Sequence, residues 1–198
     1  MRKTLTLAVK PDLLGRFFLF FQQGVLIKTT VGCSIKTWLL QYLGITSEYI
    51  AGRIQTIFLD EKAVDDIETT AIRDGSRLSL SGALPGLVGA TLRRGGFFSS
   101  LRSSITHSVD DKMPPQKEGW MTIKLFNLLI PELGPLLLNK GFYIPGEALA
   151  EFLKSQKEDF WPGCQSAYLN SSEIDLKTLK EMQWSTDKKL VLLRVLIV

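Results

Sequence analysis

The chain has 198 residues, of which 45% are apolar and 22% charged, and its formal net charge is +4. These values are ordinary for a soluble globular protein and allow one large domain or two small ones. The net positive charge is small and the sequence has no lysine-rich run, and both observations argue against a nucleic-acid partner.

The single histidine, His107, and the widely separated Cys33 and Cys164 give no metal-ligand spacing and no disulfide framework. No catalytic triad can be assembled without His107, so the sequence indicates no catalytic residues, no metal and no cofactor. The basic N-terminus is followed by an apolar run that ends at Lys10 and Pro11, which is too brief for a signal peptide. The phenylalanine-rich stretch 17–21 is too short to span a bilayer. We therefore predict a cytoplasmic protein without a transmembrane segment.

In chain order, residues 4–9 alternate polar and apolar side chains, as a half-buried strand does. The stretch 17–21 fits a helix or a strand. Residues 25–31 are rich in β-branched side chains and predict a strand that pairs with 4–9 as a long-looped hairpin. Ser34 is a plausible N-cap for a helix that ends at Gly44 and has one apolar face, made of Ile35, Trp38, Leu39, Tyr42 and Leu43. Strands are predicted at 54–59 and 76–81.

The order strand, strand, helix, strand, short segment, strand resembles a β-grasp sheet. The residues that carry the resemblance are 31–44 (strand end, cap and helix), 57–64 (strand and turn) and 70–80, with Asp74-Gly75 before the last strand. Residues 25–82 thus resemble the ubiquitin-like sulfur carriers, the type of the molybdopterin synthase small subunit and the thiamine-pathway carrier. In that family a C-terminal diglycine is adenylated and loaded with sulfur.

The stretch 82–96 is rich in glycine and ends in Arg93-Arg94-Gly95-Gly96, which is similar to the tail of such carriers. Here the diglycine is internal and has no free carboxylate, so carrier chemistry would require cleavage after Gly96. No acidic residue lies between Asp74 and Asp110, which leaves the arginines in a positive field.

Residues 85–94 fit a helix with proline at its start and Gly95 just past its end. Gly86, Gly89 and Ala90 would form a small-residue face that another backbone approaches closely. The alternative is an open loop whose N–H groups hold an anion beneath the arginines. The predicted interface or anion-binding residues are Gly86, Gly89, Arg93, Arg94, Gly95, Gly96 and Arg102.

The densest acidic cluster is Asp65, Asp66 and Glu68. Adjacent aspartates point to opposite sides of an extended chain, so we expect a solvated turn there rather than a metal site. Residues 109–119 combine charge with a Pro-Pro pair and predict a linker.

Beyond it, strands are predicted at 120–126 and 141–144 and a helix at 147–156. Residues 128–138 are interrupted by prolines and predict at most a short helical turn. Ser172 with Asp175 resembles a capping box before a second helix. The apolar end, 190–198, predicts a central strand that is covered on both faces.

The predicted fold class is α+β: a β-grasp-like N-terminal unit over 1–108, extended by 82–96, then the linker and a smaller α/β unit over 120–198. We predict a non-catalytic binding or assembly module with 82–96 in its interface. The alternative is a sulfur-carrier-like or anion-binding protein that uses Arg93, Arg94 and Gly95-Gly96. The expected partner is another protein or a second copy of the chain, with a small anion as the other candidate.

Overall fold

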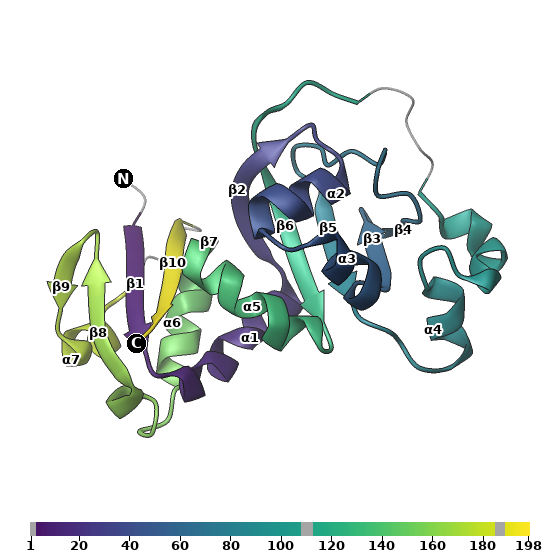
Figure 1. Cartoon of the computed structure of the whole chain (residues 1–198). Helices are drawn as coiled ribbons and strands as arrows, with labels where there is room; N and C mark the ends of the chain where they lie inside the picture. The colour runs from purple at the N-terminus through teal and green to yellow at the C-terminus, as the bar shows by residue number, and fades with distance from the viewer. Residues whose placement is uncertain (1–2, 108–112, 185–188) are drawn as a thin grey trace. The chain divides into compact units, whose positions relative to one another are not determined.

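The computed structural model describes residues 3–107, 113–184 and 189–198 and has an α+β fold. The chain forms two compact units: unit 1 holds Met1–Leu19 and Pro135–Val198, and unit 2 holds Phe20–Gly134 (Figure 1). These boundaries differ from the predicted ones, because the N-terminal strand belongs to the unit of the C-terminus. Of the predicted linker, 109–112 lie outside the described residues, and Lys117 already begins a strand.

Unit 2 contains a mixed five-stranded sheet. Its order is β4 (Lys62–Ala63), β3 (Thr56–Leu59), β5 (Arg77–Ser81), β6 (Lys117–Phe126) and β2 (Val25–Val31). Only β5 and β6 run parallel, while the other neighbouring pairs are antiparallel. Side chains alternate between the two faces of each strand, and the buried ones form the core of the unit.

One face of this sheet is covered by α2 (Ile35–Trp38), the π-helical turn η2 (Leu39–Leu43) and α3 (Ser47–Arg53), as Figure 1 shows. The predicted helix is confirmed: Ser34 accepts a hydrogen bond from the N–H of Thr37, and Gly44 ends the element with a left-handed φ of 73°. Trp38 is buried, and its indole N–H donates to the hydroxyl of Thr29 across 2.9 Å.

The predicted hairpin between 4–9 and 25–31 is wrong. β1 (Lys3–Val9) lies in unit 1, and β2 pairs in register with β6 from far along the chain. The helix α1 (Leu14–Gln23) fills the connection, so the ambiguous stretch 17–21 is helical. A connection of this kind does not fix strand register as a short turn does, and β6 offers a longer alternating partner.

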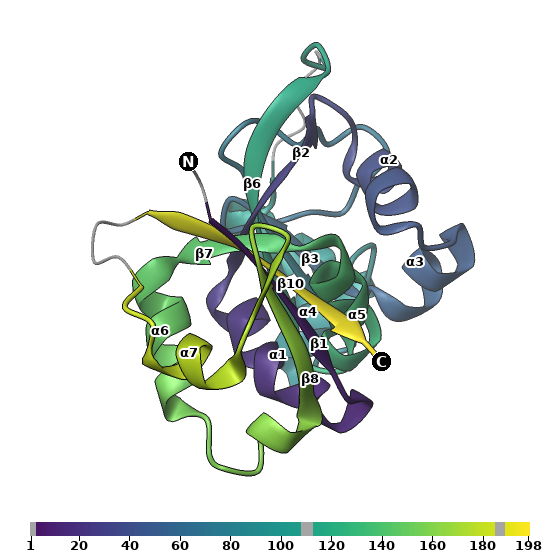
Figure 2. The ribbon, with the colours of Figure 1, turned by 90° about the vertical axis from the view of Figure 1, so that its left-hand side faces the viewer.

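The sheet of unit 1 has the order β7 (Phe142–Pro145), β10 (Leu190–Ile197), β1, β8 (Cys164–Leu169) and β9 (Ser172–Ile174). Figures 1 and 2 both draw β10 beside β1, with which it runs parallel. The central position predicted for this strand is confirmed. Its burial alternates, however, and Arg194 is exposed, so within this strand the two faces are not equally covered.

The other elements of unit 1 are η1 (Pro11–Leu13), α6 (Gly146–Ser155), η4 (Trp161–Gly163) and α7 (Leu176–Glu181). An aromatic cluster ties the first part of α1 to α6: the ring of Phe17 lies 4.9 Å from that of Phe152 and 6.1 Å from that of Phe160. Asp175 caps α7 through its carboxylate, whereas Ser172 lies in β9, so the predicted capping box is wrong.

Helix α5 (Leu129–Lys140) runs through the stretch where at most one helical turn was predicted. Pro131 stands in its first turn, where a backbone N–H has no intrahelical partner to lose. Pro135 lies inside the helix and removes one hydrogen bond. Leu129, Leu133 and Leu137 recur every four residues and are buried. Their burial outweighs the cost of the proline.

Candidate functional site

Residues 82–107 of unit 2, which we call the glycine-rich lobe, contain α4 (Gly86–Leu92) and the irregular 3-10 segment η3 (Phe97–Ile105). The predicted helix is therefore present, beginning one residue after Pro85. Figure 1 draws α4 beyond the β3–β4 edge of the sheet of unit 2. This lobe holds all the residues that the sequence predicted for the interface or anion site.

The small-residue face of α4 is closely approached by a backbone, but that backbone belongs to the same chain and not to a partner. A Cβ on the buried Gly89 would lie 1.9 Å from the carbonyl oxygen of Leu84, so only glycine fits there. Gly86 opens α4 with a φ of +76°, and nothing lies within 4 Å of its Cβ position. Gly89 therefore folds the lobe back on itself, and Gly86 provides its left-handed turn.

Arg102 is the centre of the lobe, with only 4% of its surface exposed. Its Nη2 lies 2.6 Å from Oδ1 of Asp65, its Nε donates to the carbonyl of Thr91, and its Nη1 donates to the hydroxyl of Thr106. The N–H of Gly95 donates to the same Oδ1 of Asp65 across 2.8 Å. The anion that meets the glycine loop and this arginine is thus a carboxylate of the protein.

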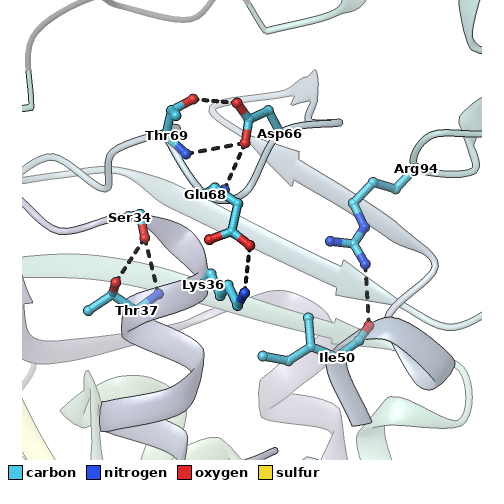
Figure 3. Close-up of polar contacts among 8 residues, drawn as sticks. All are labelled: Ser34, Lys36, Thr37, Ile50, Asp66, Glu68, Thr69 and Arg94. Atoms are coloured by element: carbon cyan, nitrogen blue, oxygen red, sulfur yellow. Dashed lines mark hydrogen bonds and ion pairs between the residues drawn. The ribbon is translucent and has the colours of Figure 1, made fainter. Parts of the chain in front are cut away.

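The other two arginines of the lobe contact different parts of unit 2. Arg93 donates from Nε to the side-chain carbonyl of Gln55, and the backbone N–H of Arg94 donates to the backbone carbonyl of Gln55. The guanidinium of Arg94 reaches the carbonyl of Ile50 at 3.4 Å (Figure 3). Partial burial lowers the pKa of Arg94 through desolvation. The three arginines therefore have separate partners rather than one shared anion site.

The predicted acidic cluster is divided among three tasks. Asp65 binds Arg102, as described above. Figure 3 shows that Asp66 accepts hydrogen bonds from the N–H groups of Glu68 and Thr69, and that Glu68 pairs with Lys36 across 2.5 Å. Asp66 is the solvated turn residue that the sequence suggested, and the local hydrogen bonds lower its pKa, with that of Thr69 contributing most.

A cavity of about 330 Å³ beside Arg94 is lined by residues of both charges, including Lys36, Asp65 and Glu68.

The outer surface of the lobe carries several large apolar side chains. Phe97 is 92% exposed, Leu101 70%, Val88 69% and Leu87 68%. Phe98 and Ile105 are also exposed, and the rings of Phe97 and Phe98 meet edge to face at 5.1 Å. The guanidinium groups of Arg93 and Arg102 and the N–H of Gly95 thus contact the rest of unit 2, while several large apolar side chains of the lobe face solvent.

A second cavity, of about 270 Å³, lies at the face of the unit 2 sheet opposite α2. Leu84 of the lobe and Phe126 of β6 are among its walls. Thr56 also lines it, and the Oγ1 atom of Thr56 is buried without a hydrogen-bond partner among the described residues. The alternating sequence of β3 and β5 could have placed these side chains on one face, but only the sheet order brings them to Phe126.

Cys33 and Cys164 are both buried free thiols. Burial raises the pKa of both, and that of Cys164 reaches about 11, so neither is an activated nucleophile. Within 3–107, 113–184 and 189–198, no three His, Cys, Asp or Glu side chains are placed to share a metal ion. No helix among these residues combines the length and apolarity needed to cross a membrane.

The sequence matches no protein-family model, no curated protein and no solved structure in the comparisons made.

Proposed function

We propose that the chain is a non-catalytic binding or assembly module whose interface is the outer surface of the glycine-rich lobe. The observation that carries the proposal is the exposure of six large apolar side chains within one short segment: Leu87, Val88, Phe97, Phe98, Leu101 and Ile105. Scattered exposed apolar residues are normal, but a concentration of them marks a surface that a partner covers.

The way the lobe is held supports this use. Its attachment to unit 2 is polar: the Arg102–Asp65 pair, the bond from Gly95 to Asp65 and the contacts of Arg93 and Arg94 with Gln55. The parallel bridge between Ala63 and Thr106 adds a backbone connection. Because the lobe is anchored through these polar groups, its apolar side chains remain free to contact a partner.

A protein partner fits this surface better than an ionic ligand does. Aromatic side chains supply large contact areas and are enriched in protein interfaces. The lobe carries no acidic residue, so a second copy of the chain would meet it without carboxylate repulsion. The first partner to test is therefore another copy of the chain. We place the chain in the cytoplasm, because free thiols such as the buried Cys33 and Cys164 stay reduced there.

Sedimentation velocity over a concentration series tests the proposal. Wild-type chain is expected to self-associate, and the triple variant Leu87→Ser, Phe97→Ser, Leu101→Ser to stay monomeric. The matched control is Leu128→Ser, which changes a leucine of unit 2 that lies outside the lobe and is also largely exposed, at 61%. A wild-type chain that remains strictly monomeric at high micromolar concentration, or a control that dissociates as the triple variant does, would count against self-association.

We also infer that unit 2 is β-grasp-like. In support, its helix α2 covers a mixed sheet, and β6 pairs with β2 in the position where strand 4–9 was expected. A sulfur-carrier-like or anion-binding role for Arg93, Arg94 and Gly95-Gly96 is the alternative proposal. The half-buried guanidinium of Arg94, which has no ion pair among the described residues, favours it. Intact-mass analysis of chain recovered from native cells decides: a species that ends at Gly96 supports the carrier, and full-length chain alone rejects it.

A further inference from the structure

One cavity of unit 2 brings side chains of both charges together. Its volume is about 330 Å³, and Arg94 of the glycine-rich lobe lines it together with Lys36, Asp65, Asp66 and Glu68. Small-molecule sites typically have volumes of about 300–1,000 Å³. This cavity lies at the lower end of that range, so it suits a molecule about the size of an amino acid.

The carboxylates of the cavity have partners within the chain. Asp65 pairs with Arg102 across 2.6 Å, and Glu68 pairs with Lys36 across 2.5 Å. Asp66 accepts its hydrogen bonds from its own turn. The side chain of Glu68 is nevertheless 63% exposed, and a carboxylate has about four acceptor positions. Glu68 can therefore accept a further hydrogen bond from a molecule in the cavity.

Arg94 differs from these residues, because its guanidinium has no ion pair among the described residues. Its Nη2 donates to the carbonyl of Ile50 at 3.4 Å, and this is its one side-chain hydrogen bond in the described part of the chain (Figure 3). A guanidinium has five N–H donors. Asp65 and Glu68 are close enough to raise the pKa of Arg94, but the larger effect of desolvation lowers it. Donors of a partly buried cation thus lack acceptors, which favours an anionic group beside them.

The lining also restricts the net charge of an occupant. A simple anion would be attracted by Arg94 and repelled by the carboxylates, and a simple cation would be repelled by Arg94. A molecule that carries both charges avoids these repulsions. An α-amino acid is such a molecule, since one carbon atom separates its carboxylate from its ammonium group. The exposed Ala51 of α3 adds an apolar part to the lining.

We propose that this cavity binds a free α-amino acid with an apolar side chain. Its carboxylate bonds to the guanidinium of Arg94, its ammonium group to the carboxylate of Glu68, and its side chain lies along Ala51. The proposal rests on the anion-binding alternative given above, because both assign an anionic group to Arg94. It is independent of the proposed protein interface, which uses the outward side chains of α4 and η3.

The test is a titration of ¹⁵N-labelled full chain, followed by amide chemical shifts, with L-valine, N-acetyl-L-valine and L-valinamide. The acetylated probe lacks the ammonium group and mimics the end of a peptide, whereas the amide lacks the carboxylate and mimics the start of one. L-valine should bind most tightly of the three. Its shifts should fall on the two segments that line the cavity, 47–51 and 65–68.

Two variants test the two charged contacts. Arg94→Met keeps an apolar stem and removes the charge, so the affinity for L-valine should fall about tenfold, as for the loss of a charged hydrogen bond. Glu68→Gln should lower the affinity for L-valine about two- to fivefold, because Glu68 is exposed, and should leave that for N-acetyl-L-valine unchanged. The matched control is Arg77→Met, which removes an exposed arginine of unit 2 that pairs with Glu61 and should leave all affinities unaltered.

The shift dispersion of each spectrum verifies that the variant is folded. The proposal is overturned if L-valine shifts none of the cavity residues up to its solubility limit, or if Arg94→Met leaves its affinity intact. It is also overturned if N-acetyl-L-valine binds as tightly as L-valine. If Arg94→Met then weakens both probes, the anion-binding alternative stands while the amino-acid site is rejected.

Discussion

The guanidinium of Arg102 and the carboxylate of Asp65 form an ion pair of 2.6 Å in which the arginine side chain is 3% exposed and the aspartate 35%. The pair joins two segments that are 37 residues apart in the sequence. The carboxylate also accepts the N–H of Gly95, so one oxygen holds both the glycine turn and η3. The orientation of the glycine-rich lobe on unit 2 therefore depends on Asp65.

Replacing Asp65 by alanine should destabilise unit 2 by about 3 kcal/mol, because it leaves a buried guanidinium without its counter-charge. Arg102→Met should cost less, since an apolar chain fills the space and the partly exposed Asp65 regains water. Urea unfolding measures both losses. Amide hydrogen exchange should show faster exchange in 86–105 for Asp65→Ala than for wild type.

The control is the exposed ion pair between Arg77 and Glu61, at 2.8 Å. Glu61→Gln should change the free energy of unfolding by less than about 1 kcal/mol, because exposed pairs contribute little. If Asp65→Ala proves no more harmful than Glu61→Gln, then Asp65 does not anchor the lobe.

Two glycine substitutions should change the stability of the fold in opposite directions. Gly89→Ala must displace the carbonyl of Leu84 and should destabilise the lobe, by about 1–3 kcal/mol as overpacking does. Gly52→Ala, in helix α3 with nothing within 4 Å of its Cβ position, should stabilise by about 0.5–1 kcal/mol. Thermal unfolding measures both. A neutral Gly89→Ala would mean that α4 does not rest on Leu84 in solution.

Local elements of this fold follow from local signals. Ser34 and Gly44 delimit the helix that they were expected to cap, and the apolar C-terminal segment is a central strand. Strand partners cannot be derived from local signals, because strand pairing is determined by the tertiary structure. Strand β2 pairs with β6 and not with β1, although β1 is closer in the sequence. Helix α5 was missed because three prolines and glycines in its sequence oppose a helix that only burial of its leucines stabilises.

The candidate site could be predicted only in part. The absence of acidic residues around the glycine-rich stretch indicates an anion or interface role for Arg102, whereas in the structure Arg102 is buried and pairs with Asp65 of the chain. For its counter-charge, Asp65, the sequence predicts only a solvated turn, because nothing local distinguishes Asp65 from Asp66. A buried arginine in an acid-free segment needs a carboxylate from elsewhere in the chain, and that requirement was the available signal.

Glu132 of α5 joins two residues of α3 and should make unit 2 sensitive to acid. Its carboxylate accepts hydrogen bonds from Arg53 and from the hydroxyl of Tyr49, and these lower its pKa from the ordinary value of 4.5, with Arg53 contributing most. A lowered pKa stabilises the folded state above pH 4.5, and this stabilisation is lost as the pH falls through the folded-state value. Glu132→Gln should cost about 1 kcal/mol at neutral pH and flatten the acid limb of stability against pH. Tyr49→Phe is the comparison: it removes the smaller of the two hydrogen bonds that lower the pKa of Glu132, so it should weaken the acid limb less than Glu132→Gln does.

The thiol of Cys164 should respond at the other end of the pH scale. Its pKa is raised by burial from 9.0 to about 11, so between these values the unfolded thiol ionises while the folded one stays neutral. The stability that this thiol contributes is complete below pH 9 and should decline as the pH rises towards 11, with a slope of at most about 1.4 kcal/mol per pH unit. Cys164→Ala, measured in parallel, should lack this part of the decline.

At pH 8 the native chain should react with a disulfide reagent only after denaturant is added, because both Cys33 and Cys164 are buried. Fast labelling of Cys164 in the native chain would contradict the burial that raises its pKa.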